Sequence, residues 1–568
     1  MVGEKKNIVL KKNKWAGILL FAGVLIALNI AAQFVYTRFD FTKEKRFTLH
    51  PKTKSILARV NQQVTVTVFL NGNLPSAFKR LQRATADLLD DYKANPGVKI
   101  KVVFTDPIAG LTQQEQDTVL HHLYEIGIEP TNLNIKNEAG FTQKMVFPMA
   151  IVQAGERQLP VKLLQNMDAG GNYEDNINNS IQNLEYLFTS AIQKVTTGEN
   201  PRIGFTEGNG EPADAYIGDA MKSLSDSYEV GRVDLNLISK QGLDKLKILF
   251  ITKPQKEFSE AVKYKINYFV MNGGRVVWSL DQVSADLDSL QGAGQQLAFN
   301  NKLNLDDMLF VYGARVNYNL VADLNCAEIP VAMGGGAGQR NIQMAPWIYY
   351  PVLIPDTSSN LVKNIDGIRT EFLSTIDTIA VKGVHKTVIL QTSAYNKVFN
   401  TPQVLSLQTV GETPDQRAYA STRKTAAVLL EGSFPSVFLN RSAPDGITEN
   451  YPAGARSQPT KMIVIGDGDI FRNQVSSRDG SVFPLGFDRY TQRNFGNKAL
   501  LLNIADYLAW DDNLIDLRNK VVKVRLLDKQ LLRTEKTKWQ LVNLILPLLL
   551  VILFAIFQHY YRKYKYAR

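Results

Sequence analysis

The chain has 568 residues, of which 45% are hydrophobic, 21% charged and 10% aromatic, and these values exclude a disordered or collagen-like protein. A mean hydropathy of −0.14 excludes a polytopic membrane protein but leaves room for one or two membrane spans. The single cysteine, Cys326, excludes an intrachain disulfide and a zinc site built from several cysteines.

The net charge of +11 is concentrated at the two ends of the chain. Residues 1–14 contribute +4 and residues 558–568 contribute another +4, which leaves +3 for the rest. A body so close to neutrality is not expected to bind nucleic acid through its charge. Each basic tail adjoins an apolar segment, so the charge pattern indicates membrane anchors.

Residues 15–36 predict a first transmembrane helix, preceded by the basic tail of residues 1–14. The segment has no charge, and about 20 such residues are enough to cross the hydrocarbon core. Trp15 and Tyr36 stand at its ends, where aromatic rings favour the membrane interface. Its apolar length exceeds that of a signal-peptide core, so we predict an uncleaved anchor.

Residues 41–197 predict a small N-terminal α/β domain, because strand and helix patterns follow one another in this part of the chain. Alternating and β-branched runs predict strands over residues 64–70, 98–104, 145–152 and 158–163. Amphipathic periodicity predicts helices over residues 76–92, 111–126 and 178–195.

Residues 201–320 predict the first part of a second α/β domain. Short apolar strands are expected over residues 202–206, 230–235, 246–252 and 275–280, and helices over residues 213–227, 258–271 and 305–312. This rhythm is typical of a mostly parallel, doubly wound sheet.

Residues 321–460 are divided by Gly- and Pro-rich stretches and predict an irregular, β-containing insertion or subdomain. Strand patterns occur at residues 386–391 and 426–430. A buried strand at 461–466 and a helix at 497–510 then return to the α/β domain over residues 461–512.

The C-terminal part predicts a charged stalk over residues 513–538, a second transmembrane helix over residues 539–557 and a basic tail over residues 558–568. The second apolar run is uncharged on every face and contains Pro547, which membrane helices tolerate. Two spans place both termini on one side, and their Lys and Arg residues favour the cytoplasm. We therefore expect an inner-membrane protein of a Gram-negative bacterium with its large middle part in the periplasm.

Two turns at the ends of predicted strands carry candidate ligand-binding residues. Glu207, Asn209 and Glu211 follow one strand, and Asp467 and Asp469 follow another. Doubly wound sheets bind ligands at this edge, whereas the alternative interpretation is a pair of tight turns capped by acidic residues. Because no third carboxylate is close in sequence to the Asp467 pair and Ca²⁺ takes six or more oxygens, we predict no metal site.

The remaining motifs do not predict catalysis. The Gly-rich residues 334–338 lack the following Lys-Ser/Thr of a phosphate loop, so the chain is not expected to hydrolyse ATP. His121 and His122 are adjacent on a helix and do not face the same way. Cys326 lies outside an exposed strand-to-helix turn of the kind that a nucleophile needs. We expect no enzyme activity, no catalytic residue and no cofactor.

Several motifs, in a fixed order over nearly the whole chain, resemble the auxiliary subunits of uncharacterised ABC transport systems, and among these the gliding-motility subunits of Bacteroidetes. The motifs are Arg38–Thr42, Arg46–Pro51, Val66–Gly72, Phe78–Leu81, Glu207–Glu211, Tyr268–Arg275, Trp347–Leu353, Val464–Asp469 and Asn503–Arg518.

The resemblance implies partnership with a polytopic, GldF-like permease subunit and a separate, cytoplasmic, GldA-like ABC ATPase, with room for a second copy of this chain. It also implies a middle domain similar to the class I glutamine amidotransferase fold. This sequence lacks that enzyme's cysteine at the strand-to-helix turn, so the domain is expected to be non-catalytic.

The expected function is therefore that of a non-catalytic, membrane-anchored subunit of an ABC-type transporter that supports gliding. Polar residues inside membrane helices favour helix–helix contacts, so candidate contacts to the permease are Asn29, Gln33, Gln540 and Asn543. The alternative function is a periplasmic module that binds a glycan or a peptide through Glu207, Asn209, Glu211, Asp467 and Asp469.

Overall fold

The computed structural model describes most of the chain, in two units that lie within Met1–Lys520 and Val521–Arg568. The described residues are 21–26 and 48–566, except for 96, 129, 138–139, 165–172, 198–199, 334–340, 357, 364, 412–413, 453, 477, 511–513, 515–516 and 518–528.

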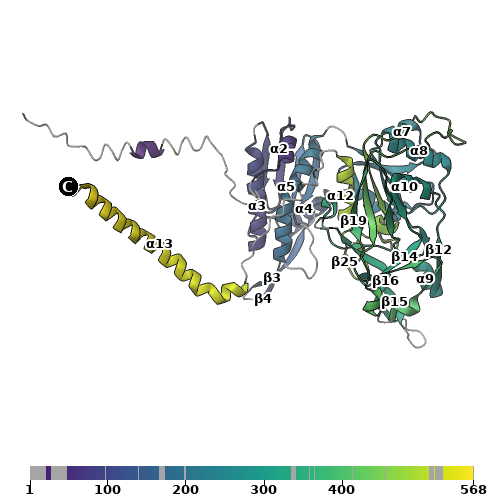
Figure 1. Ribbon diagram of the computed structural model, residues 1–568. Coiled ribbons are helices and arrows are strands. Elements are labelled where there is room, and N and C mark those ends of the chain that lie inside the picture. Colours follow the sequence, from purple (N-terminus) through teal and green to yellow (C-terminus); the bar gives the residue numbers. More distant parts are fainter. Residues whose placement is uncertain are drawn as a thin grey trace, which may run out of the picture. The chain divides into compact units, whose positions relative to one another are not determined.

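The N-terminal part of the first unit is a four-stranded sheet in the order β2-β1-β5-β6. β1 (Val64–Val68) pairs in parallel with β2 (Ile100–Phe104), whereas β5 (Met149–Ala154) is antiparallel to β1 and to β6 (Arg157–Lys162). Two long helices, α3 (Ser76–Lys93) and α5 (Tyr173–Thr196), contact each other, and α5 packs on β5 and β6 (Figure 1). Their apolar faces form one core with the valines of β1.

Further elements here are α2 (Pro51–Leu57), α4 (Gln113–Glu125) and the hairpin β3 (Thr131–Asn137)–β4 (Gly140–Val146). The prediction of one strand over residues 145–152 is wrong, because β4 ends at Val146 and β5 begins at Met149. Pro148 lies between them and cannot donate a ladder hydrogen bond. The sequence analysis also missed α2, which Pro51 starts and the His50 side chain caps by accepting from Lys52 N.

The central part is built on a large sheet in the order β15-β16-β19-β22-β23-β10-β9-β7-β8, with β17 paired to β16. Its parallel strands are β7 (Arg202–Glu207), β8 (Glu229–Asp234), β9 (Ile248–Thr252), β10 (Arg275–Ser279) and β23 (Thr460–Ile465). In chain order these strands are arranged 2-1-3-4-5, so the winding direction switches between β7 and β9.

Helices cover both faces of this sheet. On one face, α6 (Asp214–Ser225) and α12 (Asn497–Ala509) share a core with Ile248 and Phe250. On the other, α8 (Glu260–Met271) and α10 (Asp306–Tyr312) share a core with Leu249 and Ile251. Alternate residues of β9 therefore enter opposite cores, and the predicted mixed α/β class is confirmed. The specific likeness to an amidotransferase stays a prediction.

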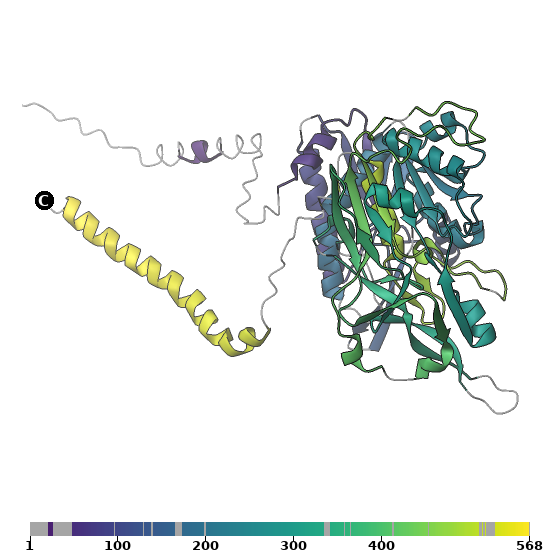
Figure 2. The ribbon, with the colours of Figure 1, turned by 45° about the vertical axis from the view of Figure 1, so that its right-hand side comes forward.

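Between β10 and β23 the chain adds antiparallel strands to the same sheet (Figure 2). These are β15 (Cys326–Met333), β16 (Asn341–Pro355), β17 (Ile368–Arg369), β19 (Val384–Gln391) and β22 (Thr425–Gly432). The segment from 321 to 460 therefore contributes to the central sheet, a question that the sequence left open. The domain boundaries as such stay predictions.

Smaller sheets flank the large one. They are β11 (Val283–Ser284) with β12 (Gln295–Asn300) and β21 (Gln403–Ser406), β13 (Ala314–Val316) with β18 (Ile376–Thr378), β14 (Asn319–Asp323) with β20 (Asn396–Asn400), and β24 (Phe487–Asp488) with β25 (Arg493–Asn494). The short helices are α7 (Lys240–Asp244), α9 (Leu287–Ala293), α11 (Gln416–Tyr419), η1 (Asn360–Val362), η2 (Leu407–Gly411) and η3 (Asp469–Phe471).

A buried ion pair joins the N-terminal part to the central part. Asp506 on α12 lies 2.7 Å from the ammonium of Lys194 on α5, and its carboxylate accepts hydrogen bonds from Tyr186 and Tyr228 at 2.8 and 2.5 Å. The side chains of Lys194 and Asp506 are only 13% and 16% exposed. Two oxygens of one carboxylate therefore hold groups from both parts of the unit.

The second unit contains α13 (Lys529–Tyr566), with Pro547 inside it. Its segment Glu535–Lys565 is long and apolar enough to cross a membrane, and none of its apolar stretch is buried. It includes the predicted span 539–557 and is consistent with a membrane anchor. In the first predicted span, residues 21–26 are helical, and the rest, with Asn29 and Gln33, lies outside the described residues.

We expect Asp506→Asn to lower the free energy of unfolding by about 3–5 kcal/mol at pH 7, because it leaves the buried Lys194 uncompensated. Burial alone would raise the pKa of Asp506, but the charge of Lys194 outweighs burial and lowers this pKa. The stability that the ionised Asp506 contributes is therefore present above the unfolded pKa of about 4 and is lost as the pH falls through the folded-state pKa. The variant should therefore lose part of the acid dependence of stability. Thermal unfolding of the full chain in detergent measures both effects.

The matched control is Asp377→Asn, which breaks the exposed Arg315–Asp377 pair at 2.6 Å. An exposed pair contributes at most about 1 kcal/mol. Equal losses in the two variants would contradict a special role for the Asp506 contact.

Candidate functional site

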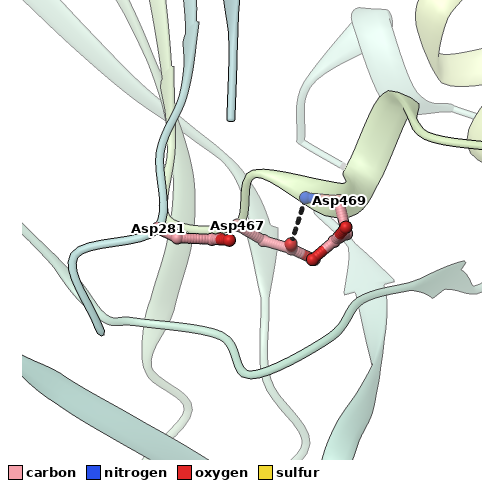
Figure 3. Close-up of side chains that lie close together, drawn as sticks. All are labelled: Asp281, Asp467 and Asp469. Atoms are coloured by element: carbon pink, nitrogen blue, oxygen red, sulfur yellow. Dashed lines mark hydrogen bonds between the residues drawn. The ribbon is translucent and has the colours of Figure 1, made fainter. Parts of the chain in front are cut away.

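Charged side chains meet at the carboxyl ends of three adjacent parallel strands. Lys253 follows β9, Asp281 lies two residues after β10, and Asp467 and Asp469 follow β23. Because β9, β10 and β23 run in the same direction, these residues reach one edge of the sheet. Figure 3 shows the three aspartates close together. We call Lys253, Asp281, Asp467 and Asp469 the Lys253 cluster.

The three carboxylates of the Lys253 cluster are close together and almost fully buried. One oxygen from each lies within 4.8 Å of the others. The ammonium of Lys253 lies 3.0 Å from Asp281 Oδ2 and also donates to Asp469. Arg472 Nη1 lies 3.0 Å from the second oxygen of Asp469. Two cations thus hold Asp469.

Backbone amides supply the remaining hydrogen bonds. Asp467 accepts from Asp469 N at 2.7 Å, drawn in Figure 3, and from Glu371 N at 3.0 Å. Gly468 N donates to Asp281 Oδ1 at 2.6 Å. A Cβ on Gly468 would lie 2.8 Å from Lys253 Cβ and 2.9 Å from that same oxygen. Glycine is therefore needed for this close approach.

The environment separates the proton affinities of the carboxylates. Burial, followed by the charges of Asp469 and Asp281, raises the pKa of Asp467 well above its usual range. Burial also acts on Asp469, but Lys253 and Arg472 outweigh it and lower the pKa of that carboxyl. For Asp281, burial outweighs Lys253 and raises the pKa. Lys253 itself stays protonated, because Asp281 and Asp469 outweigh burial and raise its pKa.

This arrangement changes the argument about a metal ion. The sequence analysis found no third carboxylate near Asp467 and Asp469, and the structure supplies one in Asp281, which lies 186 residues earlier in the chain. The structure also places the ammonium of Lys253 between two of the carboxylates. Lys253 thus provides the positive charge that a metal ion would otherwise provide.

A small polar pocket adjoins the Lys253 cluster. Its lining consists of Arg369, Glu371, Asp469, Arg472, Gln474, Gly486, Phe487 and Asn497. Arg369 Nη1 lies 2.8 Å from Glu371 Oε1, and Arg472 pairs with Asp469, so each guanidinium has a carboxylate partner. Asn497, the first residue of α12, fixes the backbone of Arg369 through two hydrogen bonds.

The Glu207–Glu211 turn follows β7, at the switch in winding direction. Gly208 and Gly210 have φ values of 103° and 80°, which glycine adopts without strain. Glu207 pairs with Arg232 at 3.2 Å, and Glu211 accepts from Asn209 N at 2.7 Å.

The backbone oxygen of Asn209 accepts from Gln255 N and Lys256 N at 2.9 and 2.8 Å, which ties the turn to the segment after β9. One side-chain oxygen of Asn209 and one of Glu211 are buried and accept no hydrogen bond. The hydrogen bonds of the turn fit the capping interpretation, and these two oxygens are available to a donor.

Helix α6, which follows the Glu207–Glu211 turn, contacts the residues that follow Asp469. The guanidinium of Arg472 lies 4.3 Å from the centre of the Tyr216 ring, and Asn473 N donates to Tyr216 O at 2.8 Å.

The sequence analysis missed Lys253, Asp281, Arg369, Glu371 and Arg472. For the first two, a signal existed, because each closely follows a continuous apolar strand.

Cys326 and Lys253, two groups that could act as nucleophiles, are held in unreactive forms. Cys326 is half-buried, and burial, assisted by the negative charge of Asp323, raises the pKa of its thiol to about 12. A thiol in this state is a poor nucleophile at neutral pH. Lys253 is protonated and held by two carboxylates.

We expect Lys253→Gln to lower the free energy of unfolding by about 3–5 kcal/mol at pH 7, because Asp281 and Asp469 lose their shared counter-charge. Without that charge the folded-state pKa of both aspartates rises, so the folded protein takes up protons. The stabilisation that comes from these bound protons is present at low pH and is lost as the pH rises through the raised folded-state pKa of the two aspartates. The deficit should shrink between pH 7 and pH 5 in thermal unfolding of the full chain.

Lys256→Gln is the matched control, because Lys256 lies in the same segment and is exposed. It should leave stability unchanged at both pH values. A deficit of Lys253→Gln that is the same at pH 7 and pH 5 would rule out the electrostatic explanation.

Comparison with known proteins gives one distant curated relative and one similar solved structure. A curated, uncharacterized protein of Borreliella burgdorferi is 22% identical over 375 residues, which cover 64% of this chain and 65% of that protein, so the match spans less than two thirds of the relative. A solved structure, the mmIFT52 N-terminal domain, matches with 12% identity and a TM-score of 0.30, and covers 54% of this chain and 96% of that structure.

Two family models match in succession along the chain. Residues 43–153 match a domain of unknown function, and residues 200–504 match the model of an ABC-type uncharacterized transport system. The second match runs from the approach to β7 into α12 and so includes the Lys253 cluster, the pocket and the Glu207–Glu211 turn. Because this match covers more than half of the chain, the protein belongs to the family of auxiliary components of ABC-type uncharacterized transport systems.

Proposed function

We propose that the chain is a non-catalytic, membrane-anchored subunit of an ABC-type transporter complex that supports gliding motility, with its large unit in the periplasm and both termini in the cytoplasm. Its partners would be a polytopic, GldF-like permease subunit and a GldA-like ATPase. The observation that carries the proposal is the family match over residues 200–504, in a chain that also has an apolar, unburied helix.

The unburied helix supports assembly in a membrane. None of the apolar stretch of α13 is buried, and such a surface requires lipid or another helix. The sequence has no phosphate loop, so ATP hydrolysis would come from a separate subunit. Both points support a division of labour in which this chain contributes an anchor and an extramembrane unit.

The pocket beside the Lys253 cluster supports a second candidate, a module that binds a glycan or a peptide. Its lining offers two guanidinium groups, two carboxylates and the ring of Phe487. Asp469 belongs to this lining, as the ligand-binding alternative predicts. The unused oxygens of Asn209 and Glu211 lie in a neighbouring turn at the same sheet edge. This candidate is compatible with the first, because a transporter subunit can also bind a ligand.

The test of the proposal is purification of the full chain from its native membrane, in mild detergent after crosslinking, followed by mass spectrometry. We expect a polytopic membrane protein and an ABC ATPase to be recovered in a fixed ratio. Recovery of the chain alone, despite crosslinking, would overturn the proposal. A bound small molecule without those partners would favour the ligand-binding module.

Gln540 and Asn543 are three residues apart on α13 and therefore share a face. Each polar contact between membrane helices contributes about 0.6 kcal/mol, so we expect Gln540→Leu with Asn543→Leu to weaken association with the permease roughly eightfold. Quantitative recovery of the crosslinked permease measures this effect.

The control is Ile545→Ala with Ile552→Ala, on the opposite side of the helix by the 3.6-residue repeat. It should leave recovery unchanged. A larger effect of the control than of the polar pair would contradict the assigned face.

A further inference from the structure

We propose that the small polar pocket beside the Lys253 cluster binds a small organic carboxylate, such as the C-terminal carboxylate of a short peptide. The residues that argue for this ligand class are Arg369, Arg472, Gln474, Phe487 and Asn497, all of which line the pocket. The proposal deepens the ligand-binding candidate and rests on it. It does not depend on assembly with a permease or an ATPase.

Both carboxylates that line the pocket already accept hydrogen bonds. One oxygen of Glu371 lies 2.8 Å from Arg369 Nη1, and the other accepts from the Tyr350 hydroxyl at 3.1 Å. The two oxygens of Asp469 are held by two cations, as described above. A ligand that had to donate hydrogen bonds would therefore meet carboxylates whose oxygens are all engaged.

The side-chain amides of the pocket use their oxygens in the same way. Gln474 Oε1 accepts from Arg489 N at 3.0 Å, and Asn497 Oδ1 accepts from Arg369 N at 3.1 Å. Together with the carboxylates, these are all the side-chain oxygens of the lining. Each of them has a donor among the residues that the structure describes.

Donor groups, by contrast, remain available. Arg369 Nε is buried and has no hydrogen-bond partner among the described residues. Arg472 binds Asp469 through Nη1, and a guanidinium carries five N–H groups in all. A buried donor without an acceptor is unfavourable, so the capacity that is left favours a ligand that accepts hydrogen bonds.

The beginning of α12 adds a partial positive charge. Asn497 is the first residue of this 13-residue helix and lines the pocket. Gly496 precedes it at the N-cap position, and no side chain there caps the helix amides. The amino end of a helix attracts anions, because its amides lack partners and the helix dipole is positive there. This second feature also favours a negatively charged ligand.

The charge balance of the lining favours a single negative charge on the ligand. Arg369 and Arg472 are balanced by Glu371 and Asp469, so the formal charge of the lining is zero. A doubly charged phosphate would place its second charge beside these two carboxylates. A carboxylate carries one charge and matches the planar fork of a guanidinium.

The same hydrogen-bond pattern favours a peptide end over a sugar. Sugar hydroxyls donate as well as accept, and their donors would find no unused oxygen on the side chains of the lining. A C-terminal carboxylate only accepts. The ring of Phe487 also lines the pocket and offers an apolar surface to the adjoining side chain of a peptide.

The experiment is calorimetric titration of the full chain in mild detergent with N-acetylphenylalanine and with its amide. These probes differ only in that one carboxylate oxygen becomes an NH2 group, which donates and carries no charge. We expect the dissociation constant of the acid to be at least tenfold lower than that of the amide. Glucuronate and inorganic phosphate serve as further probes, and we expect both to bind more weakly than N-acetylphenylalanine.

A variant links the binding to this pocket. Gln474→Glu keeps an oxygen for Arg489 N and adds a negative charge to the lining, so it should raise the dissociation constant of N-acetylphenylalanine at least tenfold. Gln416→Glu is the matched control, because it adds the same charge at an exposed position of α11, outside the lining. The control should leave the dissociation constant unchanged. Thermal unfolding checks that both variants remain folded.

Equal binding of the acid and the amide would overturn the proposal, as would unchanged binding in folded Gln474→Glu. Tighter binding of glucuronate or phosphate would assign the pocket to another ligand class and would also overturn it, while the ligand-binding candidate would stand. Failure of all four probes to bind would overturn the proposal without bearing on assembly with the permease, which the crosslinking experiment tests separately.

Discussion

The ammonium group of Lys253 holds together the ends of strands that come from distant parts of the chain. It pairs with Asp281 after β10 and with Asp469 after β23, and both carboxylates are almost fully buried. An unpaired buried charge costs several kcal/mol, so the fold tolerates these aspartates only where Lys253 and Arg472 reach them. The long segment between β10 and β23 must therefore return in one register, with Gly468 against Lys253.

Asp506 imposes the same kind of constraint at the junction of the N-terminal and central parts. Its two carboxylate oxygens hold Lys194 and Tyr186 from α5 and Tyr228 from the central part. Leu514 and Leu517, farther along the chain, pack with Ile56 and Tyr186 in a small apolar cluster. The residues after α12 thus contact α2 and α5, and the two parts share both a polar and an apolar contact.

Local sequence patterns were sufficient for the parallel strands of the central sheet and for the longer helices, because these elements bury continuous apolar runs or one apolar face. The strands β9, β10 and β23 are rich in apolar residues, and α3 and α6 each bury one apolar stripe. The same patterns could not pair Lys253 with Asp281, because that requires the order of strands in the sheet. They also could not show that Leu297 faces solvent while Leu405 is buried, because the side of each strand is set by what packs on it.

The ion pairs at the sheet edge and the exposed apolar side chains differ in how strongly they favour contact with another molecule. In the described part of the chain, Lys253, Arg369 and Arg472 each pair with a carboxylate of the Lys253 cluster or of the pocket. Exposed apolar side chains occur along α13, and Leu297, Phe299 and Val404 on β12 and β21 are also exposed. Apolar surface is removed from water by lipid or by another protein surface. Burial of these apolar side chains against lipid or another protein would be favourable, as expected of an auxiliary component of a transport system.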